Sequence, residues 1–153
     1  METIFPMTDS DNLRKAGLKA TLPRLKILNI LEQSSTGHLT AEEVYKAMIE
    51  SGDEAGLATV YRVLTQFESA GLVIRHNFEG GRSVFELNQG GHHDHMVCVE
   101  CSRVFEFVDP EIEKRQHQAA ERAGFVMEDH SLYLYGVCSG MRDRGVCSKK
   151  ESS

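Results

Sequence analysis

Ten consecutive residues, 92–101, contain three histidines, two carboxylates and two cysteines. Packing of a hydrophobic core does not require this mixture, whereas metal ions bind imidazole, carboxylate and thiolate groups. Side chains alternate between the two faces of an extended strand, so we expect His93 and His95 on one face and His92 and Asp94 on the other. The stretch therefore predicts two metal sites that begin from opposite faces of one strand.

The two cysteines of this stretch, Cys98 and Cys101, have the Cys-x2-Cys spacing that lets two thiolates reach one tetrahedral ion across a turn. Cys138 and Cys147 are the only other cysteines, so a four-thiolate zinc site would use them all. The eight residues between them leave open whether Cys147 is the fourth ligand. A thiol redox pair is the alternative, but histidines precede the pair and a β-like run follows at residues 104–108, which favours a metal.

Length and charge bound the class of protein. A chain of 153 residues suggests one domain or two small ones, and no apolar run approaches membrane-spanning length. Without a visible export signal, we expect a cytoplasmic protein with reduced thiols, no membrane partner and no small organic ligand. The net charge of −6 argues against nucleic acid, yet residues 12–31 carry five basic and no acidic side chains. That strip predicts either phosphate contact or a solvated helix face.

Residues 1–87 have the order of a winged-helix DNA-binding domain. Helices are expected at residues 8–16, from Thr21 to about 33, from the capping box at Thr40 to about 51, and at 57–70. Two strand-like runs, 72–76 and 83–87, flank a Gly-Gly turn typical of a hairpin. The helix at 57–70 would be the recognition helix, although its periodicity alone also fits an ordinary amphipathic helix.

Residues 88–91 are expected to be a hinge, followed by a small α/β dimerisation domain over residues 92–153. Strands are expected at the His/Cys stretch, at 104–108 and along the β-rich run 125–135, with a helix from about 109 to 123. Such a small sheet would have an open edge and an apolar helix face, which a second chain would cover. The predicted fold class is therefore α+β.

The remaining ligands suit a divalent ion such as Fe²⁺, Mn²⁺ or Zn²⁺. His93 and His95 need oxygen partners, and the strand carboxylates Glu86 and Glu106 are available, with His38 as a further ligand from the first domain. For the opposite face the candidates are His92, Asp94, Glu113 and His130. A site with ligands from both domains would fix their relative angle, which is how a metal could control DNA binding.

The chain resembles the ferric uptake regulator family over nearly its full length, in residues 15–19, 21–28, 56–64, 75–81, 83–87, 92–101 and 130–136. The resemblance implies a homodimeric, or tetrameric, repressor that binds AT-rich operators of iron-acquisition genes with Fe²⁺ as corepressor, Mn²⁺ as a substitute and a structural Zn²⁺. It places the regulatory site on His38, Glu86, His93, His95 and Glu106, the second site on His92, Asp94, Glu113 and His130, and the zinc site on Cys98, Cys101, Cys138 and Cys147. It places DNA contact on Lys19, Thr59, Tyr61, Arg62 and Arg75.

The leading interpretation is therefore a metal-dependent repressor that is not an enzyme. A zinc-responsive repressor of the same family is the closest rival, because zinc-sensing relatives share much of the scaffold. Peroxide-sensing relatives differ, because they have aspartates where this chain has Glu86 and Glu106. A metallohydrolase and a thiol redox switch are alternatives from other classes, but the sequence has no helical His-Glu-x-x-His motif.

Overall fold

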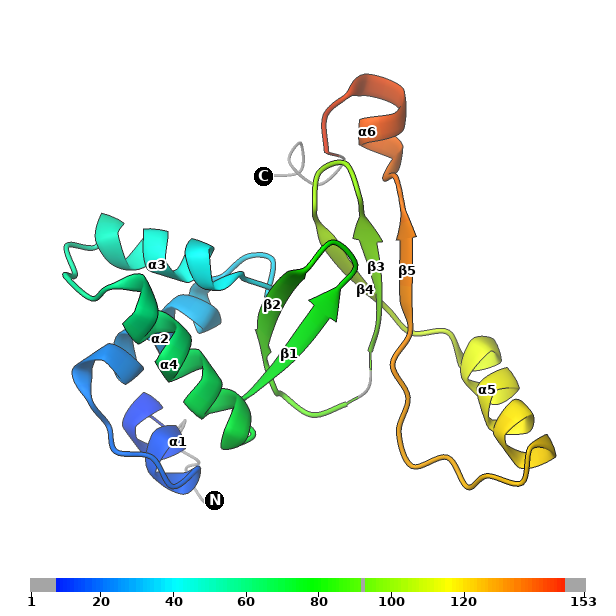
Figure 1. The fold of residues 1–153 in the computed structure, drawn as a ribbon, viewed down its shortest axis with the longest axis horizontal. Helices are drawn as coiled ribbons and strands as arrows, with labels where there is room; N and C mark the ends of the chain where they lie inside the picture. Colours follow the sequence, from blue (N-terminus) through cyan, green and yellow to red (C-terminus); the bar gives the residue numbers. More distant parts are fainter. Residues whose placement is uncertain (1–7, 92, 148–153) are drawn as a thin grey trace, which may run out of the picture. The chain divides into compact units, whose positions relative to one another are not determined.

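The structure is a computed structural model that describes residues 8–91 and 93–147 (Figure 1). The chain divides into two compact units, Met1–Gln89 and Gly90–Ser153, and the division falls inside the segment expected to be a hinge. Helices and two separate small sheets make up these units, which confirms the α+β class. Within the described ranges, no helix combines the length and apolar character that crossing a membrane requires.

The first unit consists of four helices followed by a hairpin. Its elements are α1 (Asp9–Lys15), α2 (Leu22–Gln33), α3 (Ala41–Glu50), α4 (Leu57–Ser69), β1 (Val73–Phe78) and β2 (Arg82–Leu87). The two strands pair antiparallel, from Val73 opposite Leu87 to Phe78 opposite Arg82. A single bridge between Leu39 and Phe85 also ties the segment between α2 and α3 to β2. The order of elements is that of a winged helix, as the sequence predicted.

Local sequence signals explain where these helices begin and end. The Thr40 side chain accepts a hydrogen bond from the Glu43 N–H, and the Glu43 carboxylate accepts one from the Thr40 N–H, which is the complete capping box expected for α3. After α4 the chain turns at Gly71, whose φ of 78° lies in the left-handed region that favours glycine. These signals fix both ends of the α3–α4 pair.

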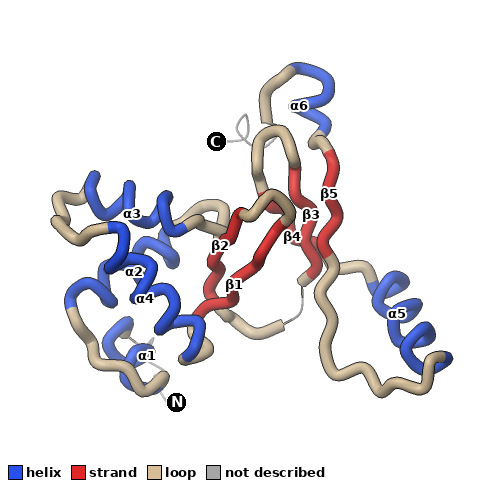
Figure 2. Tube along the Cα trace, in the orientation of Figure 1, coloured by secondary structure: helices blue, strands red, loops and turns tan. Residues whose placement is uncertain are grey.

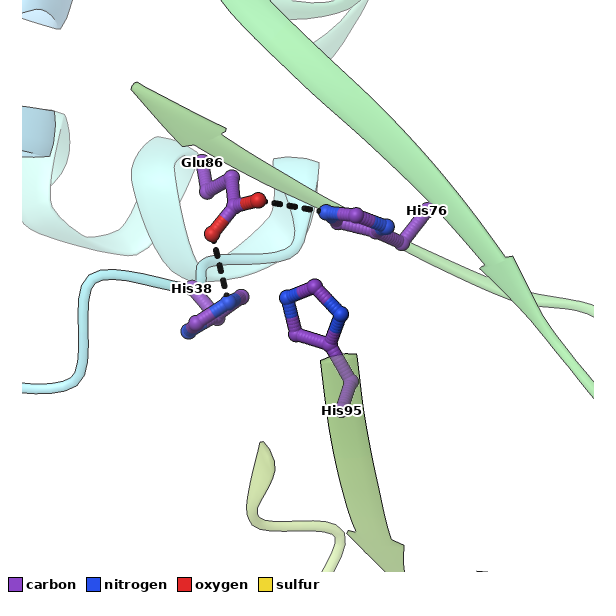
Figure 3. Close-up of side chains that lie close together, drawn as sticks. All are labelled: His38, His76, Glu86 and His95. Carbon is purple, nitrogen blue, oxygen red and sulfur yellow. Dashed lines mark hydrogen bonds and ion pairs between the residues drawn. The ribbon is translucent and has the colours of Figure 1, made fainter. Parts of the chain in front are cut away.

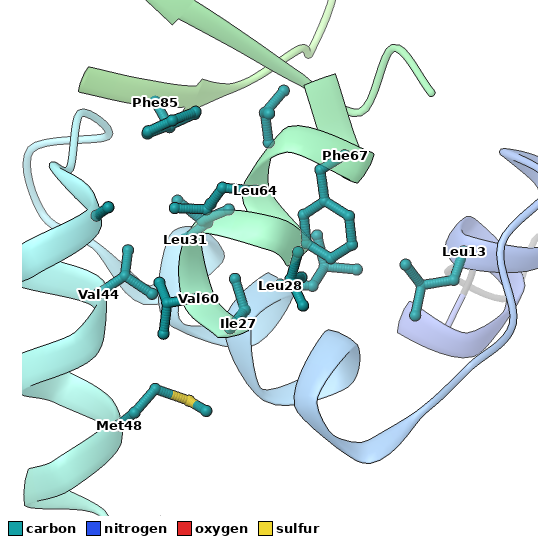
Figure 4. Packing of buried hydrophobic residues seen from close by; sticks show 13 residues of the cluster. Leu13, Ile27, Leu28, Leu31, Val44, Met48, Val60, Leu64, Phe67 and Phe85 are labelled. Atoms are coloured by element: carbon teal, nitrogen blue, oxygen red, sulfur yellow. The ribbon is translucent and has the colours of Figure 1, made fainter. Parts of the chain in front are cut away.

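One hydrophobic core holds the first unit together (Figure 4). The α4 face that carries Val60, Val63, Leu64 and Phe67 is buried, as its helical spacing predicted. Helices α1, α2 and α3 and the hairpin complete the core with Leu13, Ile27, Leu28, Leu31, Ala41, Val44, Met48, Val73 and Phe85. Every helix and strand of the first unit contributes a side chain to this core. The side of α4 that faces away from the core lies at the surface.

The second unit is built on a three-stranded sheet (Figure 2). Its elements are β3 (Asp94–Cys98), β4 (Val104–Phe107), α5 (Pro110–Arg122), β5 (Tyr133–Gly136) and α6 (Ser139–Arg144). The strand order is β4-β3-β5, with β4 antiparallel and β5 parallel to β3. This unit therefore places β3, with residues 94–98 of the His/Cys stretch, at the centre of the sheet.

The second unit differs from the expectations in three respects. Only residues 133–135 of the β-rich run 125–135 lie in a strand, β5, which extends to Gly136, because the pairing of β5 with β3 begins with Tyr133 opposite His95. The short helix α6, between the last two cysteines, was not expected. Residue 93 precedes β3, so the alternation of faces holds from Asp94 onward.

Helix α5 covers little of this sheet within one chain. The Asp109 side chain caps it, accepting hydrogen bonds from the Glu111 and Ile112 N–H groups, yet none of its residues is buried. On the sheet, Met96, Phe105, Leu134 and others line a largely apolar hollow of about 540 Å³. The second unit thus exposes apolar surface that a single chain does not bury.

Candidate metal sites and DNA-binding surface

The predicted regulatory residues of the first unit, His38 and Glu86, are in direct contact. The His38 Nε2 atom lies 2.7 Å from Oε2 of Glu86, and the His76 Nε2 atom lies 2.7 Å from the other carboxylate oxygen (Figure 3). One ligand atom from each of these three residues lies within 4.8 Å of the others. His38 comes from the segment before α3, His76 from β1 and Glu86 from β2, so the fold of one unit assembles the group.

The bonds of His38 suit a cation. Its Nδ1 atom lies 2.9 Å from the Thr36 carbonyl oxygen, while Nε2 faces Glu86. A neutral imidazole has one N–H and one lone pair, and only N–H groups pair with acceptor oxygens. With Nδ1–H donating to Thr36, Nε2 presents its lone pair toward the carboxylate unless a second proton or a metal ion lies between them. A backbone-bound Nδ1–H is also the usual orientation of a metal-binding histidine.

His76 is the functional candidate that sequence reasoning missed. It lies opposite Val84, and Ile74 lies opposite Glu86, so His76 and Glu86 are diagonal neighbours on one face of the hairpin. The signal was present in the hairpin register, since the Gly-Gly turn fixes which residues of the two strands face each other. His76 therefore joins the candidates for this site, either as a ligand or as a residue that orients Glu86.

The other predicted regulatory residues, His93, His95 and Glu106, belong to the second unit. His95 on β3 and Glu106 on β4 are directly paired, so their side chains share one face of that sheet. His95 is buried, and His93 is exposed in the segment that leads into β3. Their assignment to the regulatory site stays a prediction.

The predicted second site is brought together in part. The Asp94 Oδ1 atom lies 3.6 Å from Nε2 of His130, which joins the start of β3 to the segment before β5. Glu113 lies on α5 and is half-buried. His92 lies outside the described residues. Among the described residues of the predicted second site, Asp94 and His130 are the pair whose side chains lie close together.

Three of the four cysteines gather at one end of the sheet, with Cys98, Cys101 and Cys138 contributing sulfurs within 4.8 Å of one another. The Cys101 and Cys138 sulfurs are 3.9 Å apart, and two thiolates on one tetrahedral zinc ion lie about 3.8 Å apart if each Zn–S bond is about 2.3 Å. Cys147, the uncertain fourth residue, is buried and its thiol interacts with that of Cys101. The donor set and its spacing therefore fit zinc.

The electrostatics of these thiols also favour a cation. Burial acts to raise the pKa of Cys98, but hydrogen bonds from backbone N–H groups, those of Cys101 and Cys138 first, lower it below its ordinary value. Burial, with the neighbouring thiols, raises the pKa of Cys101 to about 12. Cys98 therefore ionises more readily than an ordinary cysteine, whereas Cys101 beside it ionises less readily. A bound metal ion, which deprotonates its thiol ligands, would remove that difference.

The predicted DNA-contacting residues of α4 lie on its outer side. Tyr61 and Arg62 are exposed and Thr59 is half-buried, whereas the apolar face of the same helix is in the core. The Tyr61 hydroxyl donates a 2.7 Å hydrogen bond to the Glu42 carboxylate on α3. This bond lowers the pKa of Glu42 and raises that of Tyr61. Helix α4 is thus linked to α3 through Tyr61, one of its predicted DNA contacts.

Two basic candidates lie outside α4. Lys19 is exposed in the segment between α1 and α2. Arg75 on β1 is half-buried, with its guanidinium 4.9 Å from the centre of the Phe85 ring and its Nε atom 4.0 Å from the Glu68 carboxylate. Arg75 therefore packs toward α4 instead of extending along the hairpin, and its contact with DNA stays a prediction.

Comparisons with known proteins agree with this architecture. The chain matches the ferric uptake regulator family over residues 15–135. A ferric uptake regulation protein of Legionella pneumophila is 68% identical over 132 residues, which cover 86% of this chain and 97% of that protein. The ferric uptake regulator of Pseudomonas aeruginosa, solved with manganese, is 57% identical with a TM-score of 0.72 and covers 87% of this chain and 99% of its own. That of Francisella tularensis, solved with iron, is 43% identical with a TM-score of 0.79 and covers 83% and 96%.

Both the match over most of the chain and the identity of these relatives far exceed what a shared fold alone would give. The metals in the two related structures agree with the nitrogen, oxygen and sulfur donors that this chain gathers. The chain belongs to the ferric uptake regulator family.

Proposed function

We propose that this protein is an Fe²⁺-responsive transcriptional repressor that, as a metal-loaded homodimer, binds AT-rich operators of iron-acquisition genes. The observation that carries the proposal is the contact between His38 and Glu86, in which both ring nitrogens of His38 face oxygen atoms. That contact lies in the same unit as the exposed outer side of α4. A metal bound there acts on the part of the protein that reads DNA.

The regulatory metal would be held by His38 and Glu86 of the first unit and by His93, His95 and Glu106 of the second. Imidazole and carboxylate ligands suit Fe²⁺ and Mn²⁺ and also accept Zn²⁺. Because the ligands are divided between the two units, metal binding would restrict how one unit moves relative to the other. A dimer held in one arrangement can place its two recognition helices one helical turn of DNA apart.

Separate roles are proposed for the remaining sites. The four cysteines would hold a permanent Zn²⁺ that stabilises the second unit, and Asp94 and His130 would contribute to a second metal site with His92 and Glu113. The apolar hollow that Met96, Phe105 and Leu134 line would be covered by the partner chain. Such a protein works on DNA in the cytoplasm and has no catalytic role.

The test is binding of an AT-rich palindromic duplex, measured by gel shift with Mn²⁺ and with a chelator. The wild-type protein should bind tightly with metal and at least about 100-fold more weakly without it. His95→Ala should abolish the metal response without changing the melting temperature, because the thiolate site lies elsewhere. His117→Ala, which changes an exposed histidine on α5, is the matched control and should behave as wild type. Equal binding with and without chelator would refute the proposal.

The zinc-responsive alternative makes a different prediction with the same duplex. The nitrogen and oxygen ligand set accepts Zn²⁺, so the metals must be compared at buffered free concentrations. If Fe²⁺ is the corepressor, binding will respond at micromolar free Fe²⁺ in protein whose thiolate site is already filled with zinc. A response confined to nanomolar or lower free Zn²⁺, with none to Fe²⁺, would instead establish the zinc-responsive function.

A further inference from the structure

Arg24, one of the five basic side chains of residues 12–31 and one to which the proposed function gives no role, connects two parts of the candidate DNA-binding surface. Its Nη1 atom donates a 3.0 Å hydrogen bond to the Lys19 carbonyl oxygen, and its Nη2 atom donates a 3.1 Å hydrogen bond to Oε1 of Gln66. Lys19 lies in the segment before α2, and Gln66 lies on α4. One half-buried guanidinium on α2 therefore spans from that segment to the recognition helix.

The position of Lys19 depends on this segment. Leu18 and Ala20, on either side of it, pack against the core of the first unit, so the Lys19 side chain is directed to solvent between two anchored neighbours. The Lys19 carbonyl oxygen also accepts a 3.0 Å hydrogen bond from the Thr21 N–H, which further restrains the backbone at Lys19. Arg24 adds a charge-assisted hydrogen bond to the same oxygen, which is stronger than a neutral one.

Gln66, the residue on α4 that Arg24 binds, lies near the predicted DNA-contacting side chains of that helix. Gln66 is four residues after Arg62, so the two side chains are neighbours on one face of α4, and Val63 and Phe67 lie on the buried face. Arg24 therefore links the Lys19 backbone to the face of α4 that carries Arg62. Both donors come from one planar guanidinium, whose fixed fork a lysine ammonium cannot reproduce.

The basic residues Arg14, Lys15 and Lys26 of the same strip do not connect Lys19 to α4. On the same helix, Lys26 is paired with Asp53, and Arg14 and Lys15 are exposed on α1. Arg24 differs from all of these because it bridges two separate segments of the surface. Its position predicts an effect on the geometry of that surface, beyond the addition of one positive charge.

We propose that Arg24 is a positioning residue for DNA recognition: it fixes the backbone at Lys19 relative to the recognition helix α4, so that Lys19 and the α4 side chains engage one duplex together. The inference rests on the proposed function for its consequence in DNA binding. Its structural part, the hold on the Lys19 carbonyl group, can be tested without DNA.

The DNA-free test uses limited proteolysis with trypsin, which cleaves after lysine and arginine. The Lys19 carbonyl is the group that trypsin attacks at the Lys19–Ala20 bond, and Arg24→Lys releases it while keeping the charge and the trypsin site at residue 24. In Arg24→Lys, cleavage at Lys19, followed by mass spectrometry, should become about tenfold faster than in wild type. This factor corresponds to the free energy of one charge-assisted hydrogen bond. The matched control Lys26→Arg should leave the rate unchanged. An unchanged rate in Arg24→Lys overturns the inference.

The DNA test is a double-mutant cycle on an AT-rich palindromic duplex with Mn²⁺. Arg24→Lys should weaken binding about tenfold without a comparable change in melting temperature, and in a Lys19→Ala background it should weaken binding no further. Additive losses would show that Arg24 acts independently of Lys19 and would overturn the inference. If wild-type protein fails to bind the duplex while trypsin still shows the Arg24 effect, the proposed function fails and the hold on Lys19 stands.

Discussion

Replacing Cys138 by serine tests the claim that a thiolate-bound zinc ion holds the second unit together. Among the described residues of that unit, the buried hydrophobic side chains are Val97, Cys98 and Cys147. Two of these three are cysteines of the proposed zinc site. Full burial of one aliphatic side chain contributes about 1.5–3 kcal/mol. A structural zinc site contributes about 10–16 kcal/mol near neutral pH. Within one chain, the metal therefore outweighs the apolar core of this unit.

Loss of one of four thiolate ligands should then weaken zinc binding by about 2.5–4 kcal/mol, a quarter of the zinc contribution, or roughly 100- to 1,000-fold in affinity. We expect Cys138→Ser to lose its zinc to a chelator that leaves the wild-type protein loaded. Without zinc the folding transition of the second unit should disappear, while the first unit, with its own core, still unfolds cooperatively. Metal analysis gives the zinc content, and calorimetry combined with hydrogen exchange assigns the transitions. Cys147→Ser should give the same result, because the Cys147 thiol is buried beside that of Cys101.

The control is Val146→Ser, which places a serine at an exposed position next to Cys147 and should retain zinc. One zinc per chain and an unchanged transition in Cys138→Ser would refute the reasoning, since the second unit would then be stable without this ligand. Zinc retained only in Cys147→Ser would instead leave three cysteines as the ligand set and remove Cys147 from it.

Three further predictions concern the first unit. Phe67→Ala should destabilise it by about 3–5 kcal/mol in denaturant unfolding, because Phe67 is fully buried, and a cost below 1 kcal/mol would contradict the core described above. Thr40→Ala should cost about 1 kcal/mol through loss of the capping box on α3, whereas Thr40→Ser should restore most of it. Partial burial of its carboxyl group, a hydrogen bond that protonated Glu32 donates to Asp9, and repulsion from the Asp9 carboxylate raise the pKa of Glu32 from 4.5 to about 7. The stability that Glu32 contributes is therefore complete below pH 4.5 and is lost as the pH rises through 7. Glu32→Gln should therefore unfold at higher denaturant than wild type at pH 8 and show no such gain at pH 4, and an equal gain at both pH values would count against this account.

Much of the fold followed from local patterns in the sequence. The apolar spacing of α4 and the glycine after it predicted the helix and its end, and the capping box predicted the start of α3. The Cys-x2-Cys pair predicted the thiol group, because that spacing determines the distance between two sulfurs on its own. In each case the relevant interactions lie within a few residues along the chain.

The missed features depend on residues distant in sequence. The contact between His76 and Glu86 can be predicted only from the register of the hairpin, and Arg24 and Gln66 are 42 positions apart in the sequence. The start of β5 is set by where β3 begins, which no pattern within residues 125–135 records. Sequence patterns thus group residues that are close along the chain, whereas contacts such as those of His76 and Arg24 become visible only in the fold.

Within the first unit, a continuous set of contacts joins the His38–Glu86 pair to α4, the proposed recognition helix. The segment that carries His38 continues through the bridge between Leu39 and Phe85 into the capped start of α3, where Glu42 accepts the hydrogen bond from the Tyr61 hydroxyl. A metal on His38 and Glu86 would hold this segment against β2 and so stabilise the position of Glu42. The physical expectation is that metal binding and the Tyr61–Glu42 bond support each other.

Glu42→Gln tests this coupling, because a neutral amide accepts a weaker hydrogen bond from Tyr61 than the carboxylate does. The ratio of DNA affinities with and without Mn²⁺ should fall by about fivefold, the equivalent of about 1 kcal/mol. Tyr61→Phe should lower the ratio similarly, and the double variant should lower it no further. Glu50→Gln makes the same charge change at the exposed far end of α3 and should leave the ratio unaltered. If Glu42→Gln changed both affinities equally, Tyr61 would contribute to DNA binding without any part in the metal response, and the route from the metal to the recognition helix would have to lie elsewhere.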